Sequence, residues 1–397
     1  MKISIYNVEF GESLLLQYEN ENLLIDMGSD SNCVDFDNIW NDIYSESMDK
    51  NLSIMCSHFH DDHINGILKY NKNAKNISKV FLPDFLDLES KNGYDFVKLS
   101  VLESFFESIV LNEKLKLNLF DLLKFVMDNK TIVYFLHVGS NFHVDRQEYK
   151  VLWPDAKKIT IINNKTGHLI EHIISGINKS FDQEEYYKIA EFMDEGINTL
   201  VNGIAEQISK AYGALRDFDV DKKQDGRVDI SDISRMIERL SYVSKLLSKN
   251  SERNKEIKKY LLTFRKKQNE MSIVFHNAEN KDGANVLLLA DIPNNTFNRN
   301  IACYLHYEYK IIKVSHHGTY SHFTNRLPKS EFLLISNGKN KHPGYGKISN
   351  QYAGFYNAFQ KPKYNMICTN QRCETLELGK QCRYGKQCGV KSLKYSI

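Results

Sequence analysis

Three histidines and an aspartate crowd into one short segment of the chain. His58, His60, Asp62 and His63 stand at relative offsets of 0, 2, 4 and 5. Side chains at this spacing converge only where the chain turns sharply, as in a loop at the carboxyl end of a strand. The apolar run LSIMC just before Ser57 predicts such a strand. Imidazole and carboxylate groups together suit Zn²⁺, Mn²⁺ or iron, so the segment predicts a metal site rather than a solvated polar loop.

Apolar runs on both sides of this segment predict the strands that must hold it. They alternate with segments of helical character at residues 35–47 and 98–128, which is typical of an α/β layered fold. The expected strands are KISIYNV, SLLLQY, LLIDMG, LSIMCSH, KVFLPDF, TIVYFLHV, YKVLWP, MSIVFH, VLLLADI, YKIIKVS and EFLLISNG.

One long block between these strands has a different pattern. From about Asp155 to Gln268 the sequence is dominated by long periodic segments such as ISDISRMIERLSYVSKLLSK, which favour helices. Strand patterns resume at Met271. We therefore expect residues 155–268 to form a helical insertion between residues 1–154 and 269–397, the two halves of one domain.

Composition limits the class of protein. With 397 residues, 42% of them hydrophobic and 26% charged, the chain can bury a sizeable core, which excludes disorder and collagen-like repeats. No run approaches 18 apolar residues and the N-terminus lacks a signal-like pattern, so we expect neither a membrane span nor secretion. Seven cysteines, an odd number, fit a reducing cytoplasm better than a disulfide scaffold. A net charge of +2 argues neither for nor against a nucleic-acid partner.

The histidine segment resembles the HxHxDH signature of the metallo-β-lactamase fold superfamily, which follows a strand. Further residues match that family in order: Asp26 in LLIDMG, Gly66 after the histidines, Asp291 in VLLLADI, and His316 and His317 in KVSHHGTYS. The resemblance implies an αββα sandwich, here with the helical insertion, and a hydrolase with two divalent metal ions, Zn²⁺ or Mn²⁺.

Several motifs are similar to those of one branch of that superfamily, the ComEC-like DNA-uptake competence proteins. These motifs are Val8-Glu9-Phe10-Gly11-Glu12-Ser13, YKVLWP, the strand that starts at Asn269, KVSHHGT, and Ile335-Ser336-Asn337-Gly338 followed by His342-Pro343. The resemblance covers most of the chain except the helical insertion, residues 86–130 and the extreme C-terminus. Because that branch processes nucleic acids, it implies a phosphodiesterase or nuclease.

The family pattern also implies a role for each matched residue. The metal ligands would be His58, His60, Asp62, His63, Asp291 and one of the late histidines, for which we favour His316. Asp291 would bridge the two ions, Asp26 would orient the histidine loop, and Asp62 would also hold the metal-activated hydroxide. The adjacent His317 would then point elsewhere and donate a proton to the leaving group. Lys313 would either meet a phosphate or face solvent on its strand.

One departure from the family concerns the first metal. Many members place a further histidine between the first cluster and the bridging aspartate, whereas the branch pattern puts Asn269 there. Asparagine is a weak ligand for Zn²⁺ and suits a harder ion such as Mn²⁺ better. His137 and His143 are alternative ligands, although both precede the strand YKVLWP.

Three weaker patterns lie outside these motifs. Residues 221–232 are similar to a calcium-binding loop, but Lys223 replaces an acidic ligand, so a charged turn between helices is favoured. Four cysteines follow the spacing C-x4-C-x8-C-x5-C, which leaves open a structural zinc site or free thiols: Cys368, Cys373, Cys382 and Cys388. Residues 253–267 carry seven Lys or Arg against one Glu, and residues 372–397 carry six against two. Such runs are usually solvated faces, but they also suit contacts with a phosphate backbone.

The leading hypothesis is therefore a metal-dependent phosphodiesterase or nuclease acting on DNA or RNA. Members of the superfamily cleave several kinds of bond, so a small-molecule hydrolase acting on a lactone, thioester or cyclic nucleotide is the enzymatic alternative. A regulatory subunit of a defence or competence complex, docking a protein partner through the helical insertion, is the non-enzymatic alternative.

Overall fold

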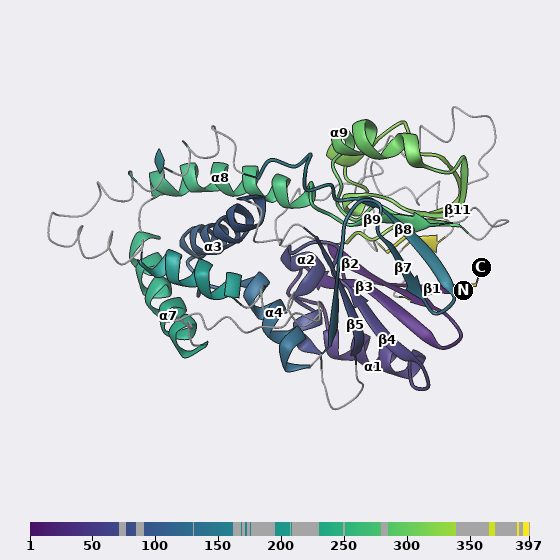
Figure 1. Ribbon diagram of the computed structural model, residues 1–397, viewed down its shortest axis with the longest axis horizontal. Coiled ribbons are helices and arrows are strands. Elements are labelled where there is room, and N and C mark those ends of the chain that lie inside the picture. The colour runs from purple at the N-terminus through teal and green to yellow at the C-terminus, as the bar shows by residue number, and fades with distance from the viewer. Residues whose placement is uncertain are drawn as a thin grey trace, which may run out of the picture. The chain divides into compact units, whose positions relative to one another are not determined.

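The fold is described from a computed structural model. It describes residues 1–70, 77–84, 91–129, 131–161, 168, 171–172, 175, 195–206, 208, 230–248, 251–278, 285–338, 365–369, 387–388 and 392–396. Strands and helices alternate along much of the chain, and its contacts divide it into two compact units. One unit comprises residues 1–84, 129–155 and 268–397, and the other comprises residues 85–128 and 156–267. The chain is thus of the mixed α/β class (Figure 1).

Seven strands form the first sheet, in the order β15-β1-β2-β3-β4-β5-β6. The strands are β1 (Lys2–Tyr6), β2 (Gly11–Gln17), β3 (Glu21–Ser29), β4 (Asn51–Met55), β5 (Ile77–Pro83), β6 (Ile132–Leu136) and β15 (Ser392–Ser396). The pairs β3–β4, β4–β5 and β5–β6 are parallel, whereas β15, β1 and β2 are joined by antiparallel pairing. Parallel neighbours end at the same edge, so residues near the ends of β3 and β4 meet there.

Eight strands form the second sheet, in the order β14-β13-β12-β11-β10-β9-β8-β7. The strands are β7 (Asn141–Val144), β8 (Gln147–Trp153), β9 (Val274–Asn277), β10 (Val286–Leu288), β11 (Glu308–Lys313), β12 (Lys329–Ile335), β13 (Asn365–Cys368) and β14 (Gln387–Cys388). The strands β10 to β14 are parallel, and β7 to β10 are antiparallel. The strands β8 and β9 pair with each other, although 120 residues separate Trp153 from Val274 (274 − 153 − 1). Two strands far apart in the sequence thus lie side by side in this sheet.

Apolar side chains from both sheets share one core. The alternating residues of β2 and β3 contribute Leu14, Leu16, Leu23 and Ile25, each at most 5% exposed, and Phe275 on β9 lies in the same cluster. Full burial of one such side chain stabilises the fold by roughly 2 kcal/mol. The two sheets accordingly pack face to face through this core.

The helix α1 (Phe36–Glu46) follows the pattern predicted for residues 35–47. Asp35 caps its N-terminus by accepting a hydrogen bond from the amide of Asn38, at 3.2 Å. Trp40 and Ile43 are its buried residues, and Nε1 of Trp40 donates to the carbonyl of Gly66 at 2.9 Å. That bond ties the helix to the segment that leaves the histidine loop.

The regular elements that the structure describes in the second unit are helices. It contains α3 (Lys91–Leu111), α4 (Asn118–Asp128), α7 (Ile230–Leu247) and most of α8 (Ser251–Asn269), and residues 195–206 are also helical. The helical stretch predicted at residues 98–128 is two helices, α3 and α4, separated by a break after Leu111. Residues 85–128 group with the helices of residues 156–267 rather than with the sheets.

Helix α8 has one apolar side and one basic side. Tyr260 and Phe264 are buried, and the ring of Tyr260 meets Phe106 of α3 edge-on, with ring centroids 5.0 Å apart. Arg265 pairs with Glu103 and Glu107 of α3. The apolar side and this ion-pair cluster fix α8 against α3 within the helical unit.

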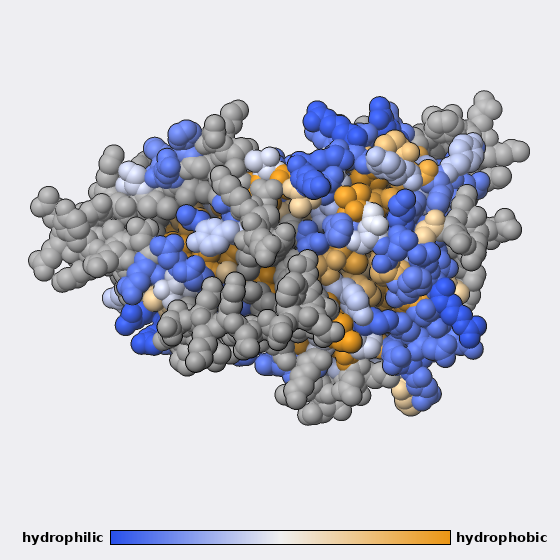
Figure 2. Space-filling view, viewed as in Figure 1, coloured by the Kyte–Doolittle hydropathy of each residue, from blue (hydrophilic) through white to orange (hydrophobic). Residues whose placement is uncertain are grey.

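The described surface is predominantly polar. On the face shown in Figure 2, hydrophilic residues dominate and hydrophobic ones show as separate patches between them. Among the described residues, none of the helices has the length and apolar character needed to cross a bilayer.

Candidate metal centre

The histidine segment leaves the first sheet at the end of β4, as its sequence predicts. After Met55 the chain forms a short loop that leads into α2 (Asp61–Ile64), a single helical turn. His58 and His63 are fully buried, and Asp62 is 9% exposed. The sharp turn that the spacing demands is therefore present.

Gly28 of β3 allows α2 to lie directly on the sheet. A Cβ atom at this position would come within 2.4 Å of both the carbonyl oxygen of Asp61 and the amide nitrogen of His63. Real Cβ atoms do not approach backbone that closely, so only glycine fits without moving the loop. The LLIDMG motif thus supplies a contact surface as well as an acidic residue.

Asp26 orients this loop through three hydrogen bonds. The amide of Ser57 donates to Oδ1 of Asp26 at 2.7 Å, and the Ser57 hydroxyl donates to Oδ2 at 2.6 Å. Nδ1 of His63 lies 2.8 Å from the same Oδ2. With its proton held on Nδ1, His63 presents the lone pair of Nε2, which is the form that binds a metal ion.

His58 is held in the same tautomer by Ser57. Its Nδ1 lies 3.1 Å from the Ser57 hydroxyl, which already donates to Asp26 and so can only accept here. Its Nε2 lies 3.0 Å from Nδ1 of His60. Two ring nitrogens this close need a cation or a proton between their lone pairs.

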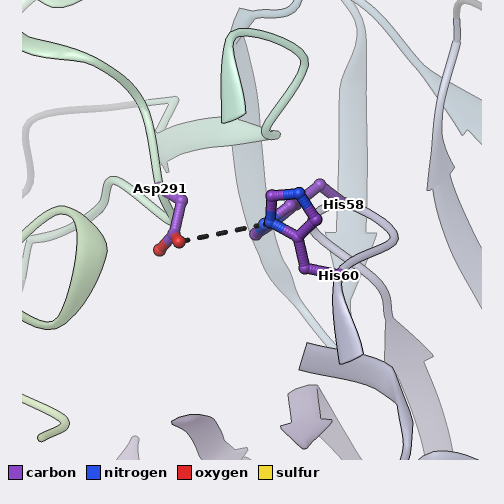
Figure 3. A group of neighbouring side chains, drawn as sticks. All are labelled: His58, His60 and Asp291. Atoms are coloured by element: carbon purple, nitrogen blue, oxygen red, sulfur yellow. Dashed lines mark hydrogen bonds and ion pairs between the residues drawn. The ribbon is translucent and has the colours of Figure 1, made fainter. Parts of the chain in front are cut away.

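Asp291 comes from the second sheet and meets this loop. It follows β10, is completely buried, and has its carboxylate pointing toward the His58 and His60 rings (Figure 3). Its Oδ2 lies 3.4 Å from Nε2 of His63 and 3.8 Å from Nε2 of His58. Within the part of the chain that the structure describes, neither carboxylate oxygen has a hydrogen-bond partner. A buried carboxylate left in this way is suited to a cation.

The donors fall into two groups. One contains His58, His60 and Asp291, the set drawn in Figure 3. The other contains Asp62, His63 and His317, and within each group the potential ligand atoms all lie within 4.8 Å of one another. Among the described residues, these are the two groups of three or more side chains that could hold a metal ion. Their donors are nitrogen and carboxylate oxygen, the set that Zn²⁺ and other borderline divalent ions accept, so the residues fit such an ion.

Of the two late histidines, His317 rather than the favoured His316 falls in one of the groups. Both have left-handed backbone, with φ of 48° at His316 and 56° at His317. His317 is fully buried, donates from Nδ1 to the Ser336 carbonyl at 3.0 Å, and places Nε2 3.2 Å from Oδ2 of Asp62. The turn thus places His317, rather than the favoured His316, in the second group, and the choice of ligand stays a prediction.

His316 lies outside both groups, at the edge of the site. Its side chain is 25% exposed, and its ring stacks on His322 with centroids 3.9 Å apart. Nδ1 lies 2.6 Å from the Thr319 hydroxyl, and Nε2 lies 3.6 Å from Oδ2 of Asp291. His322 was not among the predicted site residues, and its position five residues after His317 was its only signal in the sequence.

The carboxylates and imidazoles of the site shift each other's pKa values. Burial alone would raise the pKa of Asp62, but His63 and His317 hold it below its usual range. Burial would likewise lower the pKa of His63, but Asp291, Asp26 and Asp62 hold it well above the usual value. Burial, His63 and His60 lower the pKa of His58, which keeps it neutral. The acidic residues thus draw positive charge into the site, and a divalent ion supplies such charge.

Asn269 lies at the end of α8, in a turn that borders the site. The amide of Ile273 donates to the Ser57 carbonyl at 2.9 Å, and the Ser272 hydroxyl accepts from the amide of Asp291 at 3.3 Å. Oδ1 of Asn269 is buried and lacks a hydrogen-bond partner among the described residues. The turn therefore joins both halves of the centre.

The two alternative histidine ligands are not brought to the centre. Nδ1 of His137 lies 2.9 Å from Asp84, and His143 is exposed on β7 opposite Glu148. Neither belongs to either group.

Lys313 does not face solvent. Its side chain is 2% exposed, and Nζ lies 2.6 Å from Oε2 of the equally buried Glu12. The solvent-facing alternative is therefore wrong. The charge that a phosphate would have met is already neutralised, so the structure gives no support to that role either.

The weaker sequence patterns are largely beyond the described residues. Residues 221–229 of the calcium-like loop, His342-Pro343, Cys373 and Cys382 lie outside them. Cys368 is buried on β13, and its register partner on the neighbouring parallel strand β14 is Cys388. The zinc and free-thiol alternatives both remain predictions.

Comparison with known proteins adds little. No family model and no curated protein matches the chain. Among solved structures, it is similar to the metallo-beta-lactamase fold protein YhfI from Bacillus subtilis, with 12% sequence identity and a TM-score of 0.21. The alignment covers 38% of this chain and spans about half, 53%, of that protein. A TM-score this low says nothing about function, so the function proposed below rests on the strands and side chains of this chain.

Proposed function

We propose that this chain is a metal-dependent hydrolase with the metallo-β-lactamase fold, and that its substrate is a nucleic-acid phosphodiester. One observation carries the metal-dependent part. Six donors from three distant segments converge as two groups, and Oδ2 of Asp291 in the first group lies 3.4 Å from Nε2 of His63 in the second. Two mixed sheets packed face to face support the αββα sandwich. Residues 155–268 would be the insertion between its halves.

Each residue of the centre has a proposed task. His58, His60 and Asp291 would hold one divalent ion, with Asn269 as a weak additional ligand, and Asp62, His63 and His317 would hold the other. When bound, such ions lower the pKa of water and neutralise charge that develops on the scissile group. Asp26 fixes the tautomer of His63, and the Ser336 carbonyl fixes that of His317.

His316 lies at the partly exposed edge of the centre. Its side chain is 25% exposed, and Nε2 lies beside Asp291. Burial lowers the pKa of His316 well below the usual value, which keeps the ring neutral. Nδ1 of the neutral ring is engaged by the Thr319 hydroxyl, so Nε2 is the nitrogen that would contact a substrate or water.

The nucleic-acid substrate is favoured by the basic side of α8. Lys255, Lys258, Lys259 and Lys266 are exposed, and successive members are three, one and seven residues apart, which places them on one side of the helix. Within the described part of the chain, no acidic side chain pairs with them. A row of unpaired lysines suits the regularly spaced phosphates of a nucleic acid.

The test compares substrates and neighbouring aspartates. Purified full-length protein would be assayed on single- and double-stranded DNA, RNA, a nitrophenyl phosphodiester, thioesters and lactones, with Mn²⁺, Zn²⁺ or Mg²⁺. We expect metal-dependent cleavage of nucleic acid that Asp62→Asn lowers at least 100-fold. Asp61→Asn, the matched control one residue away and outside both groups, should retain most of it.

Three results would contradict this proposal. Full activity of Asp62→Asn would exclude the proposed centre. Cleavage confined to lactones, thioesters or a cyclic nucleotide would favour the small-molecule alternative. Metal binding without any hydrolysis would favour the regulatory subunit.

A further inference from the structure

A buried ion pair joins the two sheets beneath the metal centre. Oε2 of Glu12, on β2 of the first sheet, lies 2.6 Å from Nζ of Lys313, at the end of β11 in the second. The two side chains are 3% and 2% exposed. Nζ also donates to the Val314 carbonyl at 3.0 Å, which fixes the ammonium group in place. Both partners are therefore held rigidly and away from water.

The carboxylate of this pair faces a proposed metal ligand. Oε2 of Glu12 lies 3.9 Å from Nδ1 of His317, the nitrogen that donates to the Ser336 carbonyl at 3.0 Å. On the opposite side of the ring, Nε2 lies 3.2 Å from Asp62. The negative charge thus stands behind the ring, on the side away from the proposed ion.

His317 needs such support because its backbone is strained. Its φ of 56° lies in the left-handed region that a side chain with a Cβ atom rarely adopts. The side-chain amide of Asn337 donates to the His317 carbonyl at 2.9 Å. The centroids of the Phe10 and His317 rings lie 4.4 Å apart. These contacts fix the backbone and one face of the ring, and Glu12 adds a charge beside Nδ1.

Stability alone gives little reason to place an ion pair here. Taking two charges out of water costs about as much as their attraction returns, and well-packed apolar pairs often replace such bridges without loss. The Glu12–Lys313 pair in this position is explained if the charge of Glu12 acts on the imidazole of His317. Groups behind a ligating histidine typically change metal affinity 10- to 100-fold.

We propose that Glu12 and Lys313 are positioning residues for His317. Lys313 fixes the Glu12 carboxylate, and that carboxylate stabilises His317 with its Nδ1 proton directed inward and its Nε2 lone pair directed at the ion shared with Asp62 and His63. The pair thereby strengthens one of the two proposed cation sites. This inference rests on the proposed metal-dependent function.

The test measures metal binding rather than turnover. Chelator-stripped full-length protein would be titrated with Mn²⁺ and with Zn²⁺ by calorimetry, and thermal unfolding would be followed in parallel. The variants are Glu12→Gln, Lys313→Met and the two combined, with His317→Gln identifying which binding event belongs to the second group. Glu21→Gln is the matched control, because Glu21 is also buried in the first sheet and pairs with Lys79 at 3.0 Å.

We expect Glu12→Gln to weaken the binding event that His317→Gln abolishes by at least 10-fold, while Glu21→Gln leaves it unchanged. The combined variant removes the unpaired charge that each single variant leaves buried. It should therefore recover melting temperature relative to Lys313→Met but keep the weak affinity. That separation of stability from affinity is what a purely structural ion pair would not produce.

Two results would overturn the inference alone: wild-type affinity in Glu12→Gln, or recovery of both affinity and melting temperature in the combined variant. Absence of any metal binding by the wild type is a different result. It would overturn the proposed function, and this inference with it.

Discussion

At the scale of single residues, side-chain chemistry was readable from the sequence, but backbone conformation was not. The spacing of His58, His60, Asp62 and His63 predicted a convergent loop, and the structure brings all four together with Asp291. The positions of His316 and His317 were not readable because they depend on two successive residues with positive φ. No residue type in KVSHHGT announces that turn. The partner of Lys313 was equally hidden, because Glu12 lies 301 positions away (313 − 12).

The clearest prediction at this scale concerns Asp26. Replacing it with Asn should lower the affinity for divalent ions about 10- to 100-fold, because the amide cannot hold the proton on Nδ1 of His63 as a carboxylate does. Calorimetric titration of chelator-stripped protein would measure this loss. Asp37→Asn, an exposed change in the first turn of α1, is the control and should bind like the wild type. Equal affinities in both variants would show that Asp26 does not act on the centre.

A second prediction concerns the glycine beneath α2. In Gly28→Ala, the added Cβ would lie 2.4 Å from the backbone of both Asp61 and His63, so α2 must shift and carry Asp62 and His63 with it. We expect weaker metal binding together with a loss of stability of about 1–3 kcal/mol. Gly139→Ala is the control, because its Cβ would meet nothing within 4 Å, although its φ is +88°. That variant should lose some stability and retain affinity. Unchanged affinity in Gly28→Ala would contradict the close packing.

A third prediction concerns His276, which lies away from the centre on β9. Burial, then His306 and Lys150, lower its pKa to about 3. Because the unfolded chain has a His pKa of about 6.5, it binds the proton first on acidification. The stabilising effect of His276 is therefore complete above about pH 6.5 and is lost toward pH 3. It should account for about 2 kcal/mol of the stability lost between pH 7.5 and pH 5.

Urea unfolding of chelator-stripped protein at those two pH values would test this. His276→Gln should lose less stability than the wild type on acidification. The exposed change His143→Gln should lose as much as the wild type. If all three proteins lost the same amount, His276 would not be held neutral.

At the scale of elements, the strands with strong apolar runs were predicted well, and the weak or short ones were not. LLIDMG and LSIMC correspond to β3 and β4, whose buried residues give a clear pattern. The strands β13 and β15 were missed because Asn365–Cys368 and Ser392–Ser396 are short and lie in a basic, cysteine-containing segment. The pairing of β15 is also non-local, since it pairs with β1 at the other end of the chain. No local sequence pattern can predict such a distant partner strand.

The prediction at this scale concerns the basic side of α8. Reversing the charge at Lys255, Lys258, Lys259 and Lys266 to Glu should weaken binding of DNA and flatten its salt dependence, because fewer counterions are released. Fluorescence anisotropy across a salt series would measure both effects. A matched control reverses exposed lysines elsewhere, at Lys114 and Lys116. If the wild type had no affinity for nucleic acid at low salt, the basic side of α8 would not have its proposed role.

At the scale of the whole molecule, the candidate metal centre depends on the union of two separated halves of the chain. The histidine loop belongs to the first sheet, whereas Asp291 and His317 follow strands of the second. Residues 156–267 lie between these halves in sequence and group into a unit of their own with residues 85–128. Periodicity predicted that interruption, but it gave no sign that residues 85–128 join the helical unit. Contacts between distant helices decide that grouping.

The most direct test of the central claim is the number of divalent ions bound per chain. Chelator-stripped full-length protein would be reconstituted with Mn²⁺ or Zn²⁺, freed of excess ion and subjected to elemental analysis, alongside Asp291→Asn. Because the Asp291 carboxylate lies beside donors of both groups, the account predicts two ions per wild-type chain and a clear loss in Asp291→Asn. A wild type that retains no ion, or an Asp291→Asn variant that retains as many as the wild type, would contradict it.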